Sequence, residues 1–117
     1  MHADALVENS GLRALCAIDA VASGATLKVP SEGTDYAVFN LDGRFYVTQD
    51  ACTHGPGSLS EGYVENGEIE CPFHQGRFDI TSGQPTAPPC SDALRVWTVH
   101  LVDGQVCIDP AEDRRAG

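Results

Sequence analysis

The sequence predicts an all-β fold, a sandwich or a barrel, for this chain of 117 residues. Short runs rich in β-branched and aromatic residues recur along the chain, and Gly, Pro, Asn and Asp separate them. Three of the separators are Asp42-Gly43, Asn66-Gly67 and Asp103-Gly104. Each predicts a two-residue hairpin, because both central residues of a type I′ turn need a positive φ. No long stretch has helical periodicity, and the length predicts one domain over residues 1–117.

Nine short strands account for most of the chain, and each of the three turns joins two of them. Two strands precede the Asp42-Gly43 hairpin, and another strand ends at the turn Thr81-Ser82-Gly83. The expected strands cover residues 12–18, 25–30, 36–41, 45–48, 62–64, 68–71, 77–80, 94–102 and 106–109.

Three segments do not fit as strands and are expected to be irregular loops. They are residues 50–61, residues 72–75 and the proline-rich residues 84–92. Functional residues gather on loops that a rigid scaffold holds in place, so we look for the site there. Residues 111–117 are expected to form a flexible tail.

The charge of the chain excludes several classes of partner. Seven basic residues against seventeen acidic ones give a formal net charge of -10. Such a surface repels nucleic acid and anionic lipid, so we expect neither a nucleic-acid partner nor a membrane partner. A basic protein surface is the better expectation.

The N-terminus and the cysteine content indicate the compartment. Residues 1–10 include Asp4 and Glu8 and lack a basic region followed by an apolar stretch, so we expect a cytoplasmic protein without a secretory signal. In that compartment five cysteines are expected to be metal ligands or buried thiols rather than disulfides.

Two short motifs pair a cysteine with a histidine in the first two irregular loops. They are Cys52-Thr53-His54 and Cys71-Pro72-Phe73-His74. If the loops converge, they bring together two thiolate sulfurs and two imidazole nitrogens. A tetrahedral zinc ion and a [2Fe–2S] cluster with two cysteines and two histidines both suit this set. The single residue between Cys52 and His54 is unusual for structural zinc and favours the cluster.

With these residues the sequence resembles Rieske iron–sulfur proteins, most closely the small Rieske-type ferredoxins of bacterial aromatic-ring dioxygenase systems. The resemblance rests on the motif Cys52-Thr53-His54-Gly55 and on residues 71–79, read Cys-Pro-Phe-His-Gln-Gly-Arg-Phe-Asp. It extends to residues 58–62 and to Ala87-Pro88-Pro89, and so covers nearly the whole chain.

The resemblance implies a fold, a cofactor and its ligands. The fold is an antiparallel β-sandwich with a small cluster-binding subdomain formed by two loops, about residues 50–61 and 71–78, and covered by residues 84–92. One [2Fe–2S] cluster per chain is expected, with Cys52 and Cys71 on the buried iron and His54 and His74 on the outer iron. The residues expected around these ligands are Gly55, Phe73, Gln75, Gly76, Phe78 and Pro89.

The resemblance also implies a function. The chain is expected to be a monomeric one-electron carrier, not an enzyme. It would pass electrons from a flavin-dependent NADH ferredoxin reductase to a terminal Rieske non-haem iron oxygenase in aromatic compound degradation. Two alternatives remain: a Rieske-fold small subunit of a larger reductase such as nitrite reductase, and a zinc-bound structural module.

The cluster is expected to have a low reduction potential. Two neutral histidines make the oxidised cluster less negative than four cysteines would, which places Rieske potentials at about −150 to +300 mV. Positions 76 and 78, where high-potential members of the family have hydroxyl donors, are Gly76 and Phe78 here. The net charge of -10 also opposes gain of an electron.

The remaining candidates are expected to be structural. Cys16, Cys90 and Cys107 are interpreted as small buried residues or thiols without a functional role, and Trp97 as a core residue. Thr53 is expected to form a local hydrogen bond within its turn.

Overall fold

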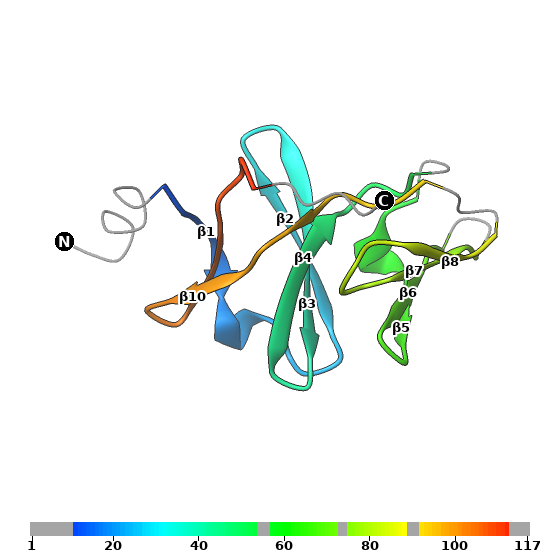
Figure 1. The fold of residues 1–117 in the computed structure, drawn as a ribbon. Helices are drawn as coiled ribbons and strands as arrows, with labels where there is room; N and C mark the ends of the chain where they lie inside the picture. The colour runs from blue at the N-terminus through cyan, green and yellow to red at the C-terminus, as the bar shows by residue number, and fades with distance from the viewer. Residues whose placement is uncertain (1–10, 54–56, 73–74, 89–91, 113–117) are drawn as a thin grey trace.

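The computed structural model describes residues 11–53, 57–72, 75–88 and 92–112. Within these ranges the chain is built from short antiparallel strands and two 3₁₀ turns (Figure 1). The elements are β1 (Arg13–Ala17), η1 (Ile18–Ala20), β2 (Thr26–Ser31), β3 (Thr34–Leu41), β4 (Arg44–Gln49), η2 (Leu59–Glu61), β5 (Tyr63–Glu65), β6 (Glu68–Glu70), β7 (Arg77–Asp79), β8 (Pro85–Ala87), β9 (Val96–Trp97), β10 (His100–Val102) and β11 (Gln105–Ile108). The expected all-β class is confirmed. None of the helical turns in the described part of the chain could cross a membrane.

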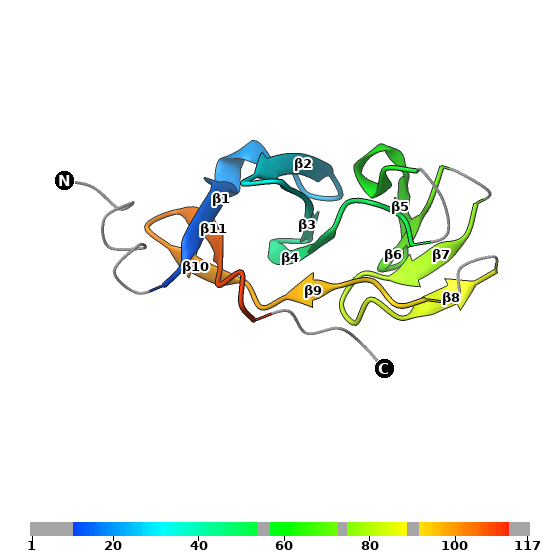
Figure 2. The same cartoon turned by 90° about the horizontal axis from the view of Figure 1, so that it is seen from above.

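The strands form three sheets that lie one after another across the molecule (Figure 2). One sheet has the order β1-β11-β10, and the next has the order β2-β3-β4-β9. The third sheet, in the order β5-β6-β7-β8, carries the two motif loops. The first two sheets correspond to the expected sandwich. The cluster-binding subdomain was expected to be formed by two loops, and in the structure these loops extend from the strands of the third sheet.

Strand β3 contributes to two separate cores. Its side chains alternate between faces, as in any strand. Tyr36 and Val38 pack with Trp97, Val106 and residues near them between the first two sheets. The opposite face carries Ala37 and Phe39, which pack in a second cluster with residues of the β5–β8 sheet. Residues 36–39 are therefore all buried, which explains why the sequence is apolar on both faces here.

All three predicted hairpin turns are confirmed. Asp42-Gly43, Asn66-Gly67 and Asp103-Gly104 each connect paired strands and have a positive φ at both residues. A fourth turn of this kind, Glu32-Gly33, joins β2 to β3 and was not expected. Its glutamate adopts the left-handed region with a φ of 49° although Asn and Asp are the usual residues there.

Two expected elements differ in the structure. The expected strand over residues 94–102 is divided, because Val96–Trp97 pairs with β4 whereas His100–Val102 pairs with β11 in another sheet. The chain thus changes sheets at Thr98 and Val99. Residues 85–87 were expected to be irregular but form β8, an edge strand whose first residue is Pro85. Proline is tolerated there, because an edge strand has one side without ladder hydrogen bonds.

The residues expected to be structural occupy such positions where the structure describes them. Trp97 is buried and contacts Tyr36 edge to face, with ring centroids 4.9 Å apart. Cys107 is fully buried, and Cys16 packs against the same core as Trp97. Cys90 lies outside the described residues. Of the expected tail, Ala111 lies in a turn that the Glu112 N–H closes on the Asp109 carbonyl oxygen, and Oε1 of Glu112 lies 3.3 Å from Nε2 of His100.

Candidate metal centre

The two motif loops close on themselves in the same way. The N–H of Cys52 donates to the carbonyl oxygen of Gly57 at 2.9 Å, and the N–H of Cys71 donates to that of Gly76 at 2.7 Å. In each loop the hydrogen bond joins the motif cysteine to a glycine five residues later. This hydrogen bond brings the two ends of each segment together. Each closed segment includes one of the two predicted histidine ligands.

The two predicted sulfur ligands lie in one core. Cys71 is fully buried and Cys52 is 6% exposed, and both belong to the cluster that includes Leu59 and Phe78. This cluster lies between strand β3 and the β5–β8 sheet. The structure therefore places Cys52 and Cys71 in the same core, and their role as ligands stays a prediction. His54 and His74 lie outside the described residues, so their place as ligands stays a prediction.

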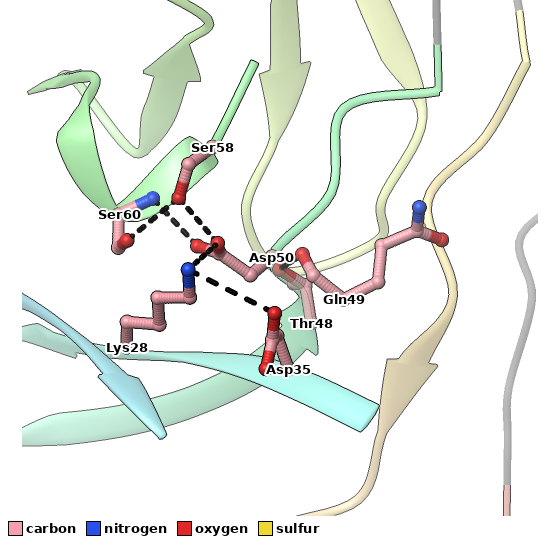
Figure 3. A network of polar contacts seen from close by, with 7 residues as sticks. All are labelled: Lys28, Asp35, Thr48, Gln49, Asp50, Ser58 and Ser60. Atoms are coloured by element: carbon pink, nitrogen blue, oxygen red, sulfur yellow. Dashed lines mark hydrogen bonds and ion pairs between the residues drawn. The ribbon is translucent and has the colours of Figure 1, made fainter. Parts of the chain in front are cut away.

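A buried carboxylate holds the open end of the first loop (Figure 3). Asp50 is 2% exposed, and its carboxylate accepts hydrogen bonds from the Ser58 hydroxyl and, at 2.8 Å, from the Ser60 N–H. Its carbonyl oxygen accepts the Leu59 N–H at 2.7 Å. Lys28 from strand β2 lies 4.0 Å from the same carboxylate. Sequence reasoning did not find this group, because Asp50 has no motif of its own.

The two loops meet at Gly62. A Cβ atom at this position would lie 2.1 Å from the carbonyl oxygen of Glu70, the residue before Cys71. Gly62 has a φ of −89°, so the glycine is needed for close approach rather than for an unusual backbone conformation. The end of the first loop thus packs directly against the strand that leads into the second.

The residues expected around the ligands are partly described. Gly76 is buried beside Cys71, Phe78 is fully buried in the same core, and Gln75 is exposed with a φ of 61°. Such a backbone conformation is uncommon for a residue other than glycine and marks a tight turn. The other three expected residues, Gly55, Phe73 and Pro89, lie outside the described residues.

Thr53 links the first loop to the proline-rich segment. Its hydroxyl donates to the carbonyl oxygen of Asp92 at 2.8 Å. The expectation of a local bond within the turn was therefore wrong. The acceptor is distant in sequence, and propensity rules for threonine describe only nearby partners. This contact places one end of residues 84–92 against the first motif loop.

One arginine joins the strands behind the second loop. Arg77 follows Gly76, and its guanidinium contacts Glu65, Glu68 and Glu70 at 3.0–3.1 Å. These three hydrogen bonds raise the pKa of Arg77 above its ordinary value. The contacts tie β7 to both strands of the β5–β6 hairpin. Single acidic residues in a sequence give no signal for such a network, because register decides which of them face one another.

The described donors fit an iron–sulfur cluster. Two thiols from loops of matching closure share one apolar core, where thiolates bound to iron are shielded from water. Within the described residues no group of three or more histidine, cysteine or acidic side chains is placed to hold a metal ion. Of the four predicted ligands, the structure describes Cys52 and Cys71, and the assignment of all four stays a prediction.

Comparisons with known proteins identify the family. The family model described as "Rieske [2Fe-2S] domain" matches residues 12–98. The ferredoxin component of the p-cumate 2,3-dioxygenase system of Pseudomonas putida is 44% identical over 106 residues, which are 88% of this chain and 89% of that protein.

Two solved structures are similar to this chain. The ferredoxin of Sphingomonas yanoikuyae B1 has a TM-score of 0.80 and 42% identity, covering 83% of this chain and 96% of that one. The ferredoxin in a complex of reduced oxygenase and oxidised ferredoxin in carbazole 1,9a-dioxygenase has a TM-score of 0.79 and 38% identity, covering 83% and 91%.

These findings decide among the alternatives left open by the sequence. The family match favours an iron–sulfur cluster over a zinc ion. Relatives described as ferredoxin components favour an electron carrier over a reductase subunit. The cofactor of the chain is a Rieske-type [2Fe–2S] cluster. The family match and the relatives together show that the chain belongs to the Rieske [2Fe–2S] family as an electron-transferring ferredoxin.

Proposed function

We propose that this chain carries single electrons from a flavin-dependent NADH reductase to a terminal ring-hydroxylating oxygenase. One observation carries the proposal: Cys52 and Cys71 share a core beneath two identically closed loops, in a chain similar to ferredoxin components of dioxygenase systems. A relative in complex with an oxygenase supports the second partner. The reductase is inferred from the need for an electron donor. We further propose that the chain works as a cytoplasmic monomer.

The four ligands have separate roles in this proposal. Cys52 and Cys71 would hold the inner iron from within the core, where both residues are buried. His54 and His74 would hold the outer iron, as the resemblance implies. When bound, the cluster supplies one site that accepts and releases a single electron. The residues around the cluster keep the same arrangement whether the cluster is oxidised or reduced.

The neighbourhood of the ligands supports a low potential. Hydroxyl donors to the cluster or to its sulfur ligands stabilise the reduced state and raise the potential. Gly76 and the buried Phe78 have no hydroxyl to donate. The net charge of -10 further disfavours the reduced state.

A redox titration of anaerobically purified protein, followed by electron paramagnetic resonance, tests the proposal. We expect a rhombic signal with an average g below 2, developing in the lower part of the range of about −150 to +300 mV. The same signal at the top of that range would contradict the low-potential carrier. A large subunit that remains bound through purification would favour the reductase-subunit alternative instead.

Replacing a predicted histidine ligand tests the assignment of the outer iron. In His54→Cys or His74→Cys, a thiolate replaces a neutral imidazole and makes the cluster more negative. The potential should fall toward the value of about −400 mV typical of all-cysteine clusters, or the cluster should be lost. His100→Cys, on strand β10 in another sheet, is the control and should keep the wild-type signal. An unchanged spectrum in a motif variant would exclude that histidine as a ligand.

A further inference from the structure

The first motif loop contains a buried anion that the cluster chemistry does not use. The Asp50 carboxylate is 3% exposed, yet the only cationic group within 4.0 Å of it among the described residues is Lys28. Burying a carboxylate is costly, and a well-packed apolar group of similar size often gives equal or greater stability. Overall stability therefore does not explain why a carboxylate is buried at this position.

The hydrogen bonds of Asp50 define what it holds (Figure 3). One carboxylate oxygen accepts the Ser60 N–H, and the other accepts the Ser58 hydroxyl. A serine hydroxyl has one hydrogen, so the 3.0 Å contact between the two serine hydroxyls must be donated by Ser60. The donor and the acceptor of each hydrogen bond in the network are thus fixed. Both partners lie on the far side of the loop that begins at Cys52.

Backbone contacts continue this connection to both cysteines. Ala51 bridges to Ser58, and the Cys52 N–H bonds to Gly57, so a shift of Ser58 moves the turn that carries the first motif. On the other side, Leu59 is fully buried beside Cys52 and Cys71. A shift at the base of the loop would therefore reach both sulfurs.

We propose that Asp50 is a positioning residue for the cluster. With Ser58 and Ser60 it forms a clasp, the Asp50 clasp, that closes the base of the first loop and holds Cys52 in register with Cys71. Lys28 balances the charge from strand β2, where it also lies 3.8 Å from Asp35. The inference rests on the proposed role of Cys52 as a ligand and goes beyond it, because Asp50 is not one of the predicted ligands.

The test compares two aspartates that share Lys28. Asp50→Ala removes the clasp, whereas Asp35→Asn removes a charge near the same ammonium without touching the loop side chains. Asp35 is about half exposed, and its backbone carbonyl still accepts the Asp50 N–H in the variant. Asp50→Asn keeps the shape and one acceptor oxygen and serves as the conservative variant. The measurements are iron per chain, the rate of iron release to a chelator, and the resonance line width.

We expect Asp50→Ala to release iron about 10-fold faster than the wild type, as for other residues that orient metal ligands. Its resonance signal should broaden, because the loop holds Cys52 in several arrangements. Asp50→Asn should recover most of the wild-type behaviour, and Asp35→Asn should match the wild type. A merely structural role would lower the unfolding midpoint of Asp50→Ala but leave its g-values and line width unchanged.

Two outcomes would overturn the proposal. One is an Asp50→Ala protein with wild-type iron release and line width. The other is an Asp35→Asn protein that loses iron as fast as Asp50→Ala, which would assign the effect to charge. If Asp50→Ala does not fold, Ser58→Ala decides, since it removes one clasp bond and should change iron release in the same direction. A wild-type protein that holds its cluster but reduces no oxygenase would contradict the proposed function and leave the Asp50 clasp intact.

Discussion

At the scale of single residues, the absence of a side chain at Gly62 determines how closely the two loops approach. A Cβ atom at Gly62 would lie against the carbonyl oxygen of Glu70, the residue before Cys71. The carbonyl belongs to the backbone of β6 and cannot turn aside as a flexible side chain could. Any substitution must therefore move one loop relative to the other.

Gly62→Ala should lower the free energy of unfolding by about 1–3 kcal/mol, the usual cost of an overpacked site. The added methyl group would be 2.1 Å from a backbone oxygen, so the shift should also alter the resonance signal. Gly24→Ala is the control, because nothing lies within 4 Å of its added Cβ and only its φ of +82° is unfavourable. The control should lose stability in denaturant melts but keep the signal. Equal signals in both variants would show that Gly62 does not set the loop geometry.

The Cys16 thiol gives a prediction for pH. Burial raises its pKa, and the nearby Cys107 thiol raises it further. The unfolded chain then loses this proton first as the pH rises above about 8.5. Folding stability falls in that range, since the unfolded state binds fewer protons. Cys16→Ala should show a smaller fall in urea midpoint between neutral and alkaline pH. An identical pH dependence in both proteins would contradict the raised pKa.

At the scale of elements, Arg77 unites three strands with a single side chain. Three carboxylates surround it from β5 and β6, and without it they would repel one another across the hairpin. The side chain is about a quarter exposed, so solvent screens part of this interaction. The network still fixes the register of β7, which carries Phe78 into the core beneath the cysteines.

Replacing Arg77 with Met keeps the length of the side chain and removes the charge. Arg77→Met should lower the thermal midpoint at neutral pH and low salt, and the deficit should shrink as added salt screens the repulsion among the three glutamates. Arg13→Met is the matched control, since Arg13 pairs with a single exposed carboxylate of Glu32 and should matter little. A deficit that is independent of salt would point to lost packing instead of charge repulsion.

The sequence predicted the elements whose signals are local. Asp42-Gly43, Asn66-Gly67 and Asp103-Gly104 predicted their hairpins, and the two cysteine–histidine motifs predicted the place of the site. Glu32-Gly33 was missed because glutamate rarely adopts a positive φ, and β8 was missed because Pro85 argues against a strand. The bond from Thr53 to Asp92 could not be predicted, because tertiary packing chooses its acceptor. The same holds for Asp50, whose partners become neighbours only when the loop folds back.

At the scale of the whole molecule, charge governs how partners arrive. A net charge of -10 attracts a basic surface over a distance that salt shortens to about 8 Å at physiological ionic strength. Acidic residues at the cluster-bearing end should guide a partner to the outer iron. Glu61 belongs to η2, whose Leu59 packs in the core of Cys52 and Cys71, whereas Asp19 belongs to η1, whose Ile18 bonds to Gly104 in the β10–β11 turn.

Electron transfer to the oxygenase should therefore slow as salt is added, by about tenfold or more between low and high ionic strength. Glu61→Gln should flatten this salt dependence in stopped-flow measurements more than Asp19→Asn does, although each variant removes one exposed charge. Equal slopes for the two variants would show that docking does not take place at the cluster-bearing end.

Strand β3 also determines how the protein would be degraded. One face of the strand packs in each core, and its two edges are paired with β2 and β4. Neither core can open far without exposing the inner face of this strand, so partial openings that a protease could cut are costly. The lifetime of the carrier would then follow its global unfolding equilibrium, so a docked chain, whose folded state the partner stabilises, would be cleaved more slowly than a free one.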